Sequence, residues 1–447
     1  MQNPFAGGQS VHEGADLAFT DPLTGLGNLR RFFDKVDRLI VDRAEDPAPF
    51  AVGILDLDGF KPINDLFGRR AGDDILQQVA MRLKASMDHQ STVARVGADE
   101  FAFLYPMTFS EDAAHQRALM LIEILSAPYD VGDRTARLSA SVGCSLFYSG
   151  EENTETLISK AETALYHAKR SGRGKVVVYT REMEEAVKRM TRIEQALRRA
   201  VAAGEVEPHF QPIVDLKSRQ IIGFEALARW TDPDLGPVSP AVFIPIAEER
   251  GIIGPLSQLL LSKATQTARS WPDELFLSFN LSPSQLVDQN TGQHILAILE
   301  RTGFDPRRLE IEITETGLMS DPQSAEKIVN DLRSVGIRVA LDDFGTGQSS
   351  LGRLREFHFD KLKIDRAFVS SILEDRPSEH IIRAILAMCE GLGMDVVAEG
   401  IEDEAQAARL VQFGCGGGQG YLFGRPSDAD ATMGYLRDAY RAMAMVD

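Results

Sequence analysis

Seven carboxylate or amide residues in the second half of the chain each follow a run of apolar and β-branched residues. They are Glu225, Asn280, Glu312, Asp342, Asp343, Glu399 and Gln419. A lysine, Lys363, ends a further apolar run. Oxygen ligands of this kind suit Mg²⁺ and Mn²⁺, and clustered divalent cations can catalyse the hydrolysis of a phosphodiester. The pattern predicts a hard-metal site with hydrolysis as its chemistry.

The elements that position these residues are apolar strands separated by helical stretches, over roughly 240 residues, which is the size of one parallel α/β barrel. Active sites of such barrels lie at the C-terminal ends of the strands, so we expect one rim to gather these side chains. Asp342 and Asp343 are adjacent, and successive side chains of a regular strand point to opposite faces. We therefore expect the strand to turn into a loop here, which lets both carboxylates reach the site.

The first half of the chain, residues 17–180, alternates strands and helices in another order. Residues 50–57 have the pattern of a buried strand. Residues 92–96 and 101–104 flank a tight turn, as in a β-hairpin. A sheet that contains a hairpin among helices indicates an α+β domain rather than a doubly wound one.

The boundaries follow from the same patterns. Residues 1–16 are aperiodic and are predicted to be a flexible lead. Residues 181–203 carry apolar side chains at helical spacing with charges between them, which predicts a connecting helix. The barrel is predicted to occupy residues 204–447.

Composition limits the classes of function. A chain of 447 residues is long enough for two or three domains. Its net charge of −18 argues against binding to a nucleic-acid polymer, which requires an excess of basic residues. Its three cysteines lie far apart, which argues against a disulfide framework or a zinc site and fits a reducing cytosol. No apolar run approaches the ~18 residues of a membrane span, and the N-terminus has no signal-peptide pattern. We expect a cytoplasmic protein with no membrane partner.

Eight motifs, in order, make the second half similar to the EAL family of cyclic-di-GMP phosphodiesterases. The naming motif is Glu225-Ala226-Leu227-Ala228-Arg229, preceded by FQPI and followed by NLS, EITE, DDFGTG, KLKID, AEGIE and QGYLFGRP. The resemblance implies a TIM barrel with two divalent cations, Mg²⁺ or Mn²⁺. The ligands it implies are Glu225, Asn280, Glu312, Asp342, Asp343 and Glu399.

The resemblance also implies roles for single side chains. Lys363 would orient or polarise the attacking water, and Glu399 is the best candidate to accept its proton. The implied catalytic set is Glu399, Lys363, Glu225 and Asp343, and the implied substrate-binding set is Gln211, Arg229, Gln419 and Glu315. Glu315 matches the glutamate that anchors the loop after the double aspartate. In that loop Gln348 stands where the family usually has Tyr or Phe.

The first half resembles the GGDEF family of diguanylate cyclases. It carries the entry motif DPLTGLGN and the signature Arg95-Val96-Gly97-Ala98-Asp99-Glu100-Phe101. The resemblance implies a cyclase-like fold with Mg²⁺ bound by Asp56 and Asp99. The residues it implies for GTP binding are Asn64, Asp73, Lys61, Glu100, Lys169 and Arg173.

One departure concerns the chemistry of this half. Ala98 replaces the second glycine of the signature, and if its φ were positive the alanine would cost on the order of 1 kcal/mol. The residues that the resemblance implies for the metal, Asp56 and Asp99, are retained. Those it implies for the guanine edge, Asn64 and Asp73, are retained as well. We therefore expect GTP binding to persist better than the condensation of two GTP molecules.

Three functions follow from these observations. The first is a phosphodiesterase that opens cyclic di-GMP to linear pGpG, with GTP as an allosteric ligand of the GGDEF half. The second is a bifunctional enzyme that also makes cyclic di-GMP. The third is a nucleotide receptor without chemistry, which the complete set of carboxylates and Lys363 opposes. We expect a homodimer formed through the barrel.

Overall fold

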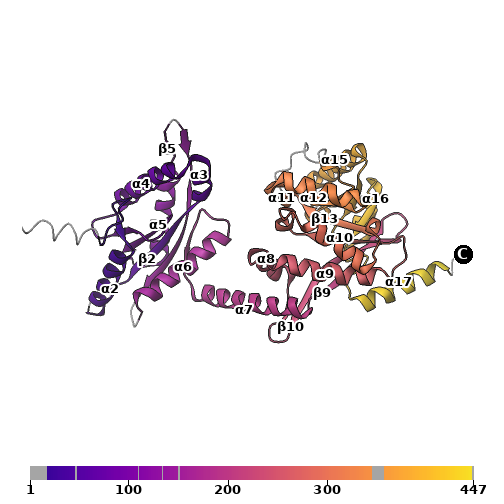
Figure 1. Ribbon diagram of the computed structural model, residues 1–447, viewed down its shortest axis with the longest axis horizontal. Helices are drawn as coiled ribbons and strands as arrows, with labels where there is room; N and C mark the ends of the chain where they lie inside the picture. Colours follow the sequence, from indigo (N-terminus) through magenta and orange to yellow (C-terminus); the bar gives the residue numbers. More distant parts are fainter. Residues whose placement is uncertain are drawn as a thin grey trace, which may run out of the picture. The chain divides into compact units, whose positions relative to one another are not determined.

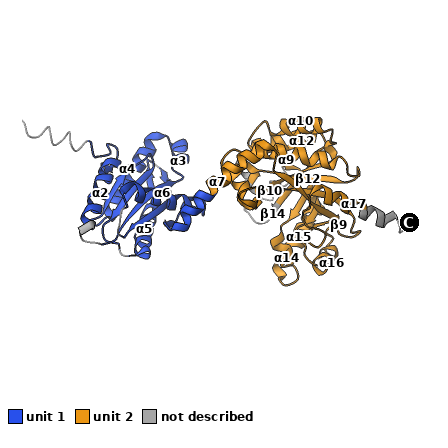
Figure 2. Ribbon diagram, turned by 90° about the horizontal axis from the view of Figure 1, so that it is seen from below, with its two compact units in different colours: residues 1–189 blue, residues 190–447 orange. Residues whose placement is uncertain are grey.

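The chain forms two compact units, residues 1–189 and 190–447, in a computed structural model (Figures 1 and 2). The structure describes residues 18–45, 48–108, 110–132, 134–148, 152–344 and 357–444. None of the helices in these ranges combines the length and the apolar content needed to cross a membrane.

The first unit is built on a six-stranded sheet in the order β1-β3-β4-β2-β7-β8. Its strands are β1 (Gly27–Asn28), β2 (Phe50–Asp58), β3 (Thr92–Arg95), β4 (Glu100–Tyr105), β7 (Ser139–Phe147) and β8 (Val176–Val178). A separate hairpin comprises β5 (Tyr129–Val131) and β6 (Arg134–Ala136). The helices are α2 (Leu29–Glu45), α3 (Phe60–Phe67), α4 (Arg69–Ser86), α5 (Glu111–Leu125) and α6 (Thr154–Arg170).

Strand β2 lies at the centre of this sheet and is buried on both faces. Phe50, Val52 and Ile54 belong to one hydrophobic core, which α2 and α6 cover. Leu55 and Leu57 belong to the other core, beneath α4 and α5. Because neighbouring side chains of a strand alternate between faces, a continuous apolar run is what a doubly covered strand requires. The predicted α+β sheet is confirmed, including the antiparallel hairpin of β3 and β4.

The second unit is a closed eight-stranded barrel. Its strands are β9 (Glu207–Asp215), β10 (Ile221–Asp232), β12 (Phe276–Leu281), β13 (Leu309–Thr314), β14 (Arg338–Phe344), β15 (Lys361–Ile364), β16 (Asp395–Ala398) and β17 (Gly417–Gln419). The sheet closes because β9 pairs with both β10 and β17. A short strand, β11 (Gly236–Val238), extends β10 as a hairpin.

The predicted barrel is confirmed, with one strand reversed. Strand β9 runs antiparallel to β10 and β17, whereas the other neighbours in the barrel are parallel. Only residues 216–220 separate β9 from β10. A parallel connection needs a crossover of a dozen or more residues, so this turn can only join antiparallel strands.

Helices fill the connections between the later strands, and one more, α17, follows the last strand. They are α8 (Pro240–Glu249), α9 (Ile253–Ala268), α10 (Thr291–Thr302), α11 (Glu315–Ser320), α12 (Pro322–Ser334), α14 (Arg366–Ser370), α15 (Arg376–Leu392), α16 (Glu404–Gln412) and α17 (Ala429–Ala444), with the 3₁₀ turns η1 (Pro283–Leu286) and η2 (Pro306–Arg308). Local sequence sets many of their ends. For example, the Asp375 and Asp403 side chains cap the N-termini of α15 and α16, and Gly393 ends α15 with a φ of 68°.

Helix α7 (Arg181–Ala203) begins in the first unit and ends in the second. Its last turns bury Ile193, Ala196, Leu197 and Ala200 in the hydrophobic core of the barrel unit. The boundary between the two units therefore falls within this helix.

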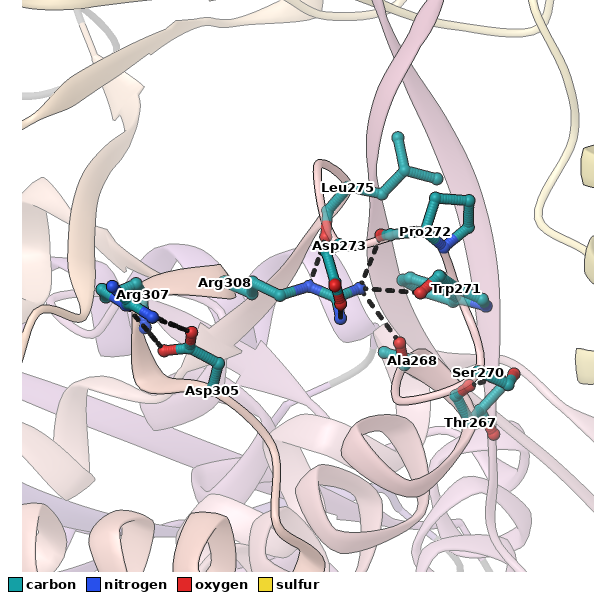
Figure 3. A network of polar contacts seen from close by, with 10 residues as sticks. All are labelled: Thr267, Ala268, Ser270, Trp271, Pro272, Asp273, Leu275, Asp305, Arg307 and Arg308. Atoms are coloured by element: carbon teal, nitrogen blue, oxygen red, sulfur yellow. Dashed lines mark hydrogen bonds and ion pairs between the residues drawn. The ribbon is translucent and has the colours of Figure 1, made fainter. Parts of the chain in front are cut away.

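Arg308 stabilises the end of the barrel where the strands begin (Figure 3). It is the last residue of η2, directly before β13, and its side chain is 11% exposed. The guanidinium donates hydrogen bonds to the carbonyl oxygens of Ala268 at 3.2 Å, Pro272 at 2.9 Å and Leu275 at 3.0 Å. It thereby ties the C-terminus of α9 and the segment that leads into β12 to the start of β13.

Candidate functional site

Lys363 lies among four carboxylates at the rim formed by the C-terminal ends of the barrel strands. Its ammonium is buried on β15, with the side chain 2% exposed. The distances from its Nζ atom are 2.5 Å to Glu399 Oε1, 2.7 Å to Glu312 Oε2, 3.7 Å to Glu225 Oε2 and 4.0 Å to Asp342 Oδ1. Five of the predicted site residues, from strands β10, β13, β14 and β15 and the end of β16, are thus brought together.

Amide side chains hold Glu225 from its other side. Asn280 Nδ2 donates to Glu225 Oε1 at 2.5 Å, and Gln419 Nε2 donates to Glu225 Oε2 at 2.6 Å. Gln419 also donates to Gln211 Oε1 at 3.2 Å. Gln211, Asn280 and Gln419 therefore belong to the same network as the carboxylates.

The carboxylates of this network differ in acidity. Burial and the neighbouring Glu225 raise the pKa of Glu312 well above its usual range, although Lys363 opposes the shift. Burial also acts to raise the pKa of Glu225, but Lys363 and the donors Gln419 and Asn280 outweigh it and lower that pKa. Burial raises the pKa of Glu399 to about 8 against the opposing effect of Lys363. The pKa of Lys363 is raised, because the attraction of the carboxylates exceeds the effect of its burial.

The donor set fits divalent cations. Four carboxylates against one ammonium leave three negative charges when every group is ionised. One oxygen of this network, Gln419 Oε1, is buried and has no hydrogen-bond partner within the described part of the chain. Among the side chains that the structure describes, no three carboxylates, histidines or cysteines are arranged as ligands of one metal ion; four carboxylates instead surround the Lys363 ammonium. An excess of hard oxygen donors of this kind is what Mg²⁺ and Mn²⁺ compensate.

A cavity of about 270 Å³ opens above Glu225, Asp342 and Glu399. It is also lined by residues that the sequence did not single out for substrate contact, among them Arg366 and Tyr421. Arg366 Nη2 donates to Glu402 Oε1 at 2.6 Å, so Glu402 belongs to this wall. Arg366 directly follows the KLKID motif, and Tyr421 lies within QGYLFGRP. Their positions in or beside these motifs are the feature of the sequence that could have indicated a place in the site.

Glycine at position 400 allows this wall to form. Gly400 has a φ of 69°, and a Cβ atom there would lie 2.2 Å from Arg366 Cγ. A side chain at position 400 would thus be strained and would also displace Arg366. Glycine at position 400 therefore lets the backbone turn directly after Glu399 and leaves room for the Arg366 side chain.

Arg229 lies within electrostatic reach of the carboxylate cluster: burial lowers its pKa, and Tyr421 and Glu225 oppose the shift. Its Nη1 donates to the carbonyl oxygen of Ala228 at 2.8 Å, and its side chain lines a second cavity of about 320 Å³. Asn280 lines this cavity too, and Leu227 borders both cavities. The second cavity is mostly apolar, with residues of α8 and α9 in its wall.

The remaining predicted residues lie at the edge of the described structure. Asp343 belongs to β14, but its side chain lies outside what the structure describes. Gln348 lies in the range 345–356, which is also outside the described residues. Glu315 is the first residue of α11, and its buried Oε2 atom has no hydrogen-bond partner among the described residues.

A second polar cluster lies in the first unit, around the end of β2. Asp56 is buried, and its Oδ2 atom lies 2.6 Å from Lys169 Nζ. Burial raises the pKa of Asp56, with Asp99 adding to the shift and Lys169 opposing it. Burial and Asp56 likewise raise the pKa of Glu100. The structure thus brings together Asp56, Asp99, Glu100 and Lys169, four of the residues that the GGDEF resemblance implies.

The predicted guanine-binding residues lie on the pair of helices α3 and α4. The Asn64 amide packs on Gly72, where a Cβ atom would lie 1.9 Å from Asn64 Oδ1. Asp73 follows Gly72 and is exposed, as is Lys61. Arg173 has a φ of 55°, and its Nε atom lies 3.9 Å from Asp58 rather than beside Asp56.

The strain considered for Ala98 is absent. Ala98 is exposed and is not among the described residues with positive φ. Its carbonyl oxygen accepts a hydrogen bond from Arg95 Nη2 at 2.7 Å. The turn between β3 and β4 therefore accommodates alanine without the backbone cost of a left-handed conformation.

Comparisons with known proteins agree with this architecture. Residues 18–175 match the family model described as diguanylate cyclase, GGDEF domain, and residues 194–426 match the EAL domain. The chain is 35% identical over 421 residues to the bifunctional diguanylate cyclase/cyclic di-GMP phosphodiesterase MucR of Pseudomonas aeruginosa, covering 93% of this chain and 61% of MucR. It is 34% identical over 418 residues to the cyclic di-GMP phosphodiesterase PdeR of Escherichia coli, covering 93% of this chain and 63% of PdeR.

The barrel also resembles a solved structure, the PaMucR phosphodiesterase in complex with c-di-GMP. The TM-score is 0.52 at 34% identity, with 54% of this chain and 99% of that chain covered. The chain spans about half to two thirds of the length of the curated relatives it matches. Motifs, fold and comparisons agree that this chain belongs to the GGDEF–EAL proteins, with a GGDEF domain followed by an EAL domain.

Proposed function

We propose that the barrel hydrolyses cyclic di-GMP to linear pGpG. The observation that carries this proposal is the rim cluster, in which the Lys363 ammonium lies within 4.0 Å of Glu225, Glu312, Asp342 and Glu399. A cavity opens directly above three of these carboxylates. The names of two relatives, MucR and PdeR, and of the PaMucR complex support cyclic di-GMP as the substrate.

The proposed ligand set comprises two groups. Glu225, Asn280, Glu312 and Asp342 would hold the first divalent cation, and Asp342, Asp343 and Glu399 the second. Bound Mg²⁺ or Mn²⁺ would polarise the phosphodiester and lower the pKa of water. Four of the five carboxylates are described and lie around Lys363, which supports the assignment.

Lys363 and Glu399 are proposed to handle the attacking water. The ammonium orients the water by a hydrogen bond, and the Glu399 carboxylate accepts its proton. Lys363 Nζ lies 2.5 Å from Glu399 Oε1, so a water that is hydrogen-bonded to the ammonium would lie next to the accepting carboxylate. The water oxygen forms a bond to phosphorus as the bond from phosphorus to the 3′ oxygen breaks. The 3′ oxygen takes up one proton, which balances the proton that Glu399 accepts, and pGpG is left with a 5′ phosphate and a 3′ hydroxyl.

Gln211, Arg229, Gln419 and Glu315 are proposed to bind or position the substrate. Gln211 and Gln419 line the cavity above the cluster, while Arg229 lines the neighbouring, mostly apolar cavity. One cyclic dinucleotide that lay across both cavities would place its phosphate over the carboxylates and a base near Arg229. In such a pose Arg229 could contact the substrate although it lines the second cavity and not the one above the carboxylates.

The GGDEF domain is proposed to bind GTP with Mg²⁺ and to regulate the barrel. The Asp56–Lys169 pair and the packing of Asn64 on Gly72 support a nucleotide site. A bifunctional enzyme is the second candidate, because Ala98 lacks the strain that would have disfavoured cyclase activity.

The chain is also proposed to form a homodimer through the barrel. Light scattering of the purified chain measures its mass and tests whether it is a dimer.

Hydrolysis by the purified chain with Mg²⁺ or Mn²⁺ tests the main proposal. Wild-type protein is expected to convert cyclic di-GMP to pGpG, and Glu225→Ala or Asp343→Asn to abolish the reaction. Normal turnover by either variant would contradict the metal assignment. A receptor without chemistry would bind cyclic di-GMP and leave it intact.

GTP separates the regulatory and bifunctional roles. In the Glu225→Ala background, accumulation of cyclic di-GMP from GTP alone would establish cyclase activity. In otherwise wild-type protein, a change in the rate of hydrolysis with GTP that Asn64→Ala abolishes would establish regulation. If GTP alters neither quantity, both roles of the GGDEF domain are wrong.

A further inference from the structure

The barrel interior contains a second charged layer, one step below the rim. Glu310 precedes Glu312 by two residues on β13, and Lys361 precedes Lys363 by two residues on β15, so each pair shares a strand face. Lys361 Nζ lies 2.8 Å from Glu310 Oε1 and 2.7 Å from Oε2, with the two side chains 5% and 1% exposed. The same ammonium lies 4.0 Å from the centre of the Phe276 ring.

Stability alone does not account for this layer. The interiors of TIM barrels are mostly filled by branched apolar side chains. A buried ion pair can often be replaced by apolar residues of similar volume without loss of stability, because both charges lose their hydration. The contacts of the Lys361–Glu310 pair with the rim above it therefore indicate another role.

Ser278 connects the two layers. It lies on β12 in register with Glu310 and is completely buried. Its Oγ atom is 2.6 Å from Glu312 Oε1 and 3.4 Å from Glu310 Oε1. A hydroxyl has one proton, so the short contact is the hydrogen bond it donates. Lys361 lies 2.7 Å from Glu310 just as Lys363 lies 2.7 Å from Glu312, so Glu310 has a cation of its own and does not compete for the Ser278 proton.

We propose that Ser278 is a positioning residue of the rim site, and that the Lys361–Glu310 pair directs its hydroxyl toward Glu312. Ser278 then holds Glu312 Oε1 while Lys363 holds Oε2 at 2.7 Å, so the plane of this carboxylate is fixed. The ligand that this positioning serves is a divalent cation. The inference rests on the metal-dependent function proposed above but concerns cation binding alone.

The test is Mn²⁺ binding to the purified full chain, measured without substrate by calorimetry or electron paramagnetic resonance. Ser278→Ala is expected to weaken Mn²⁺ binding by about 10- to 100-fold, the usual effect of losing a partner of a metal ligand. Thr265→Val is the matched control. It removes another completely buried hydroxyl of the barrel unit, one that donates to the Leu261 carbonyl within α9 at 2.7 Å. Its Mn²⁺ affinity is expected to equal that of the wild type even if its melting temperature falls.

The lower layer is tested by a pair of variants. Lys361→Met leaves Glu310 with a more distant cation, Arg338, whose Nε atom lies 3.9 Å from Glu310 Oε2. Glu310 then competes for the Ser278 proton, and Mn²⁺ binding weakens. The double variant Lys361→Met/Glu310→Gln removes the competing charge, and its affinity is expected to return toward that of the wild type. The double variant also avoids an uncompensated buried carboxylate, so it remains informative if the single variant does not fold. A double variant that binds Mn²⁺ as weakly as Ser278→Ala would contradict the role of the lower pair.

Hydrolysis, measured separately, distinguishes this inference from the proposed function. Wild-type affinity in Ser278→Ala would overturn the inference and leave the phosphodiesterase proposal intact. If the wild type binds Mn²⁺, Ser278→Ala weakens this binding and the wild type does not cleave cyclic di-GMP, the phosphodiesterase proposal is overturned and the inference stands. A wild-type chain that binds no Mn²⁺ would overturn both.

Discussion

Lys363 provides one positive charge for four carboxylates, and this imbalance determines how the rim site responds to protons and cations. In the absence of metal, retained protons reduce the excess negative charge. The pKa values of Glu312 and Glu399 lie above their usual range because both carboxyl groups are buried, and the neighbouring carboxylates add to the shift. Cations that bind here must displace those protons, so their affinity depends on pH.

Glu399 gives a pH prediction for the metal-free protein. Its pKa is about 8 in the folded chain against a usual 4.5, so folding takes up a proton between these values. The stabilising contribution is complete below pH 4.5 and is lost as the pH rises through 8. In EDTA, the melting temperature of the wild type is expected to fall across this range relative to that of Glu399→Gln. A constant difference between the two proteins from pH 5 to 9 would contradict the prediction.

Ala98 gives a prediction about stability. Its position in the signature suggests that restoring glycine would stabilise the turn, but the structure predicts the opposite. Because its φ is not positive, Ala98→Gly relieves no strain and increases the entropy of the unfolded chain. The substitution is expected to destabilise the GGDEF domain by about 0.5–1 kcal/mol. Denaturant unfolding of the full chain, followed by a probe in this domain, measures the change, and a gain in stability would count against the observed turn.

At the scale of elements, the two ends of the barrel strands have different tasks. The C-terminal ends carry the proposed chemistry, and the N-terminal ends are joined by structural contacts such as those of Arg308 (Figure 3). This division is the rule for the fold. Substitutions at the two ends are therefore expected to separate stability from activity.

Arg308 and its neighbour Arg307 form a matched pair for testing this division. Arg308→Ala leaves several buried carbonyl oxygens without their charged donor and is expected to cost about 2 kcal/mol or more. Arg307 is 80% exposed and pairs with Asp305 at 2.7 Å, so Arg307→Ala is expected to leave the melting temperature close to that of the wild type. Thermal unfolding measures both, and equal losses would refute the argument. Hydrolysis at low temperature is expected to persist in each variant.

At the scale of the whole molecule, α7 belongs to two units at once. Its last turns are part of the barrel core through Ile193, Leu197 and their neighbours. A fragment that begins at residue 190 is therefore expected to fold, whereas one that begins at residue 204 loses these side chains. The loss of a single buried leucine or isoleucine costs about 2–5 kcal/mol, so the shorter fragment is expected to melt far lower or to aggregate. Equal melting curves by circular dichroism would show that α7 is dispensable for the barrel.

Much of this organisation was predictable because it is local. Apolar periodicity and ordered motifs indicated a buried β2, the β3–β4 hairpin and a barrel whose strand ends carry oxygen donors. The predictions omitted α3 and α5, which form because their apolar faces pack on the sheet. The antiparallel direction of β9 was missed as well, although the short turn before β10 contained that information.

The sequence by itself determined which residue types end the barrel strands, since residue type and spacing are local properties of the chain. Only the tertiary structure decided how the charges are shared, because that depends on distances between strands far apart in sequence. It placed Lys363 between Glu312 and Glu399, Arg229 in a neighbouring cavity and Arg366 in the wall of the site. It also placed Ser278 between two charged layers. Closure of the barrel brings these side chains together, and no pattern along a single strand encodes it.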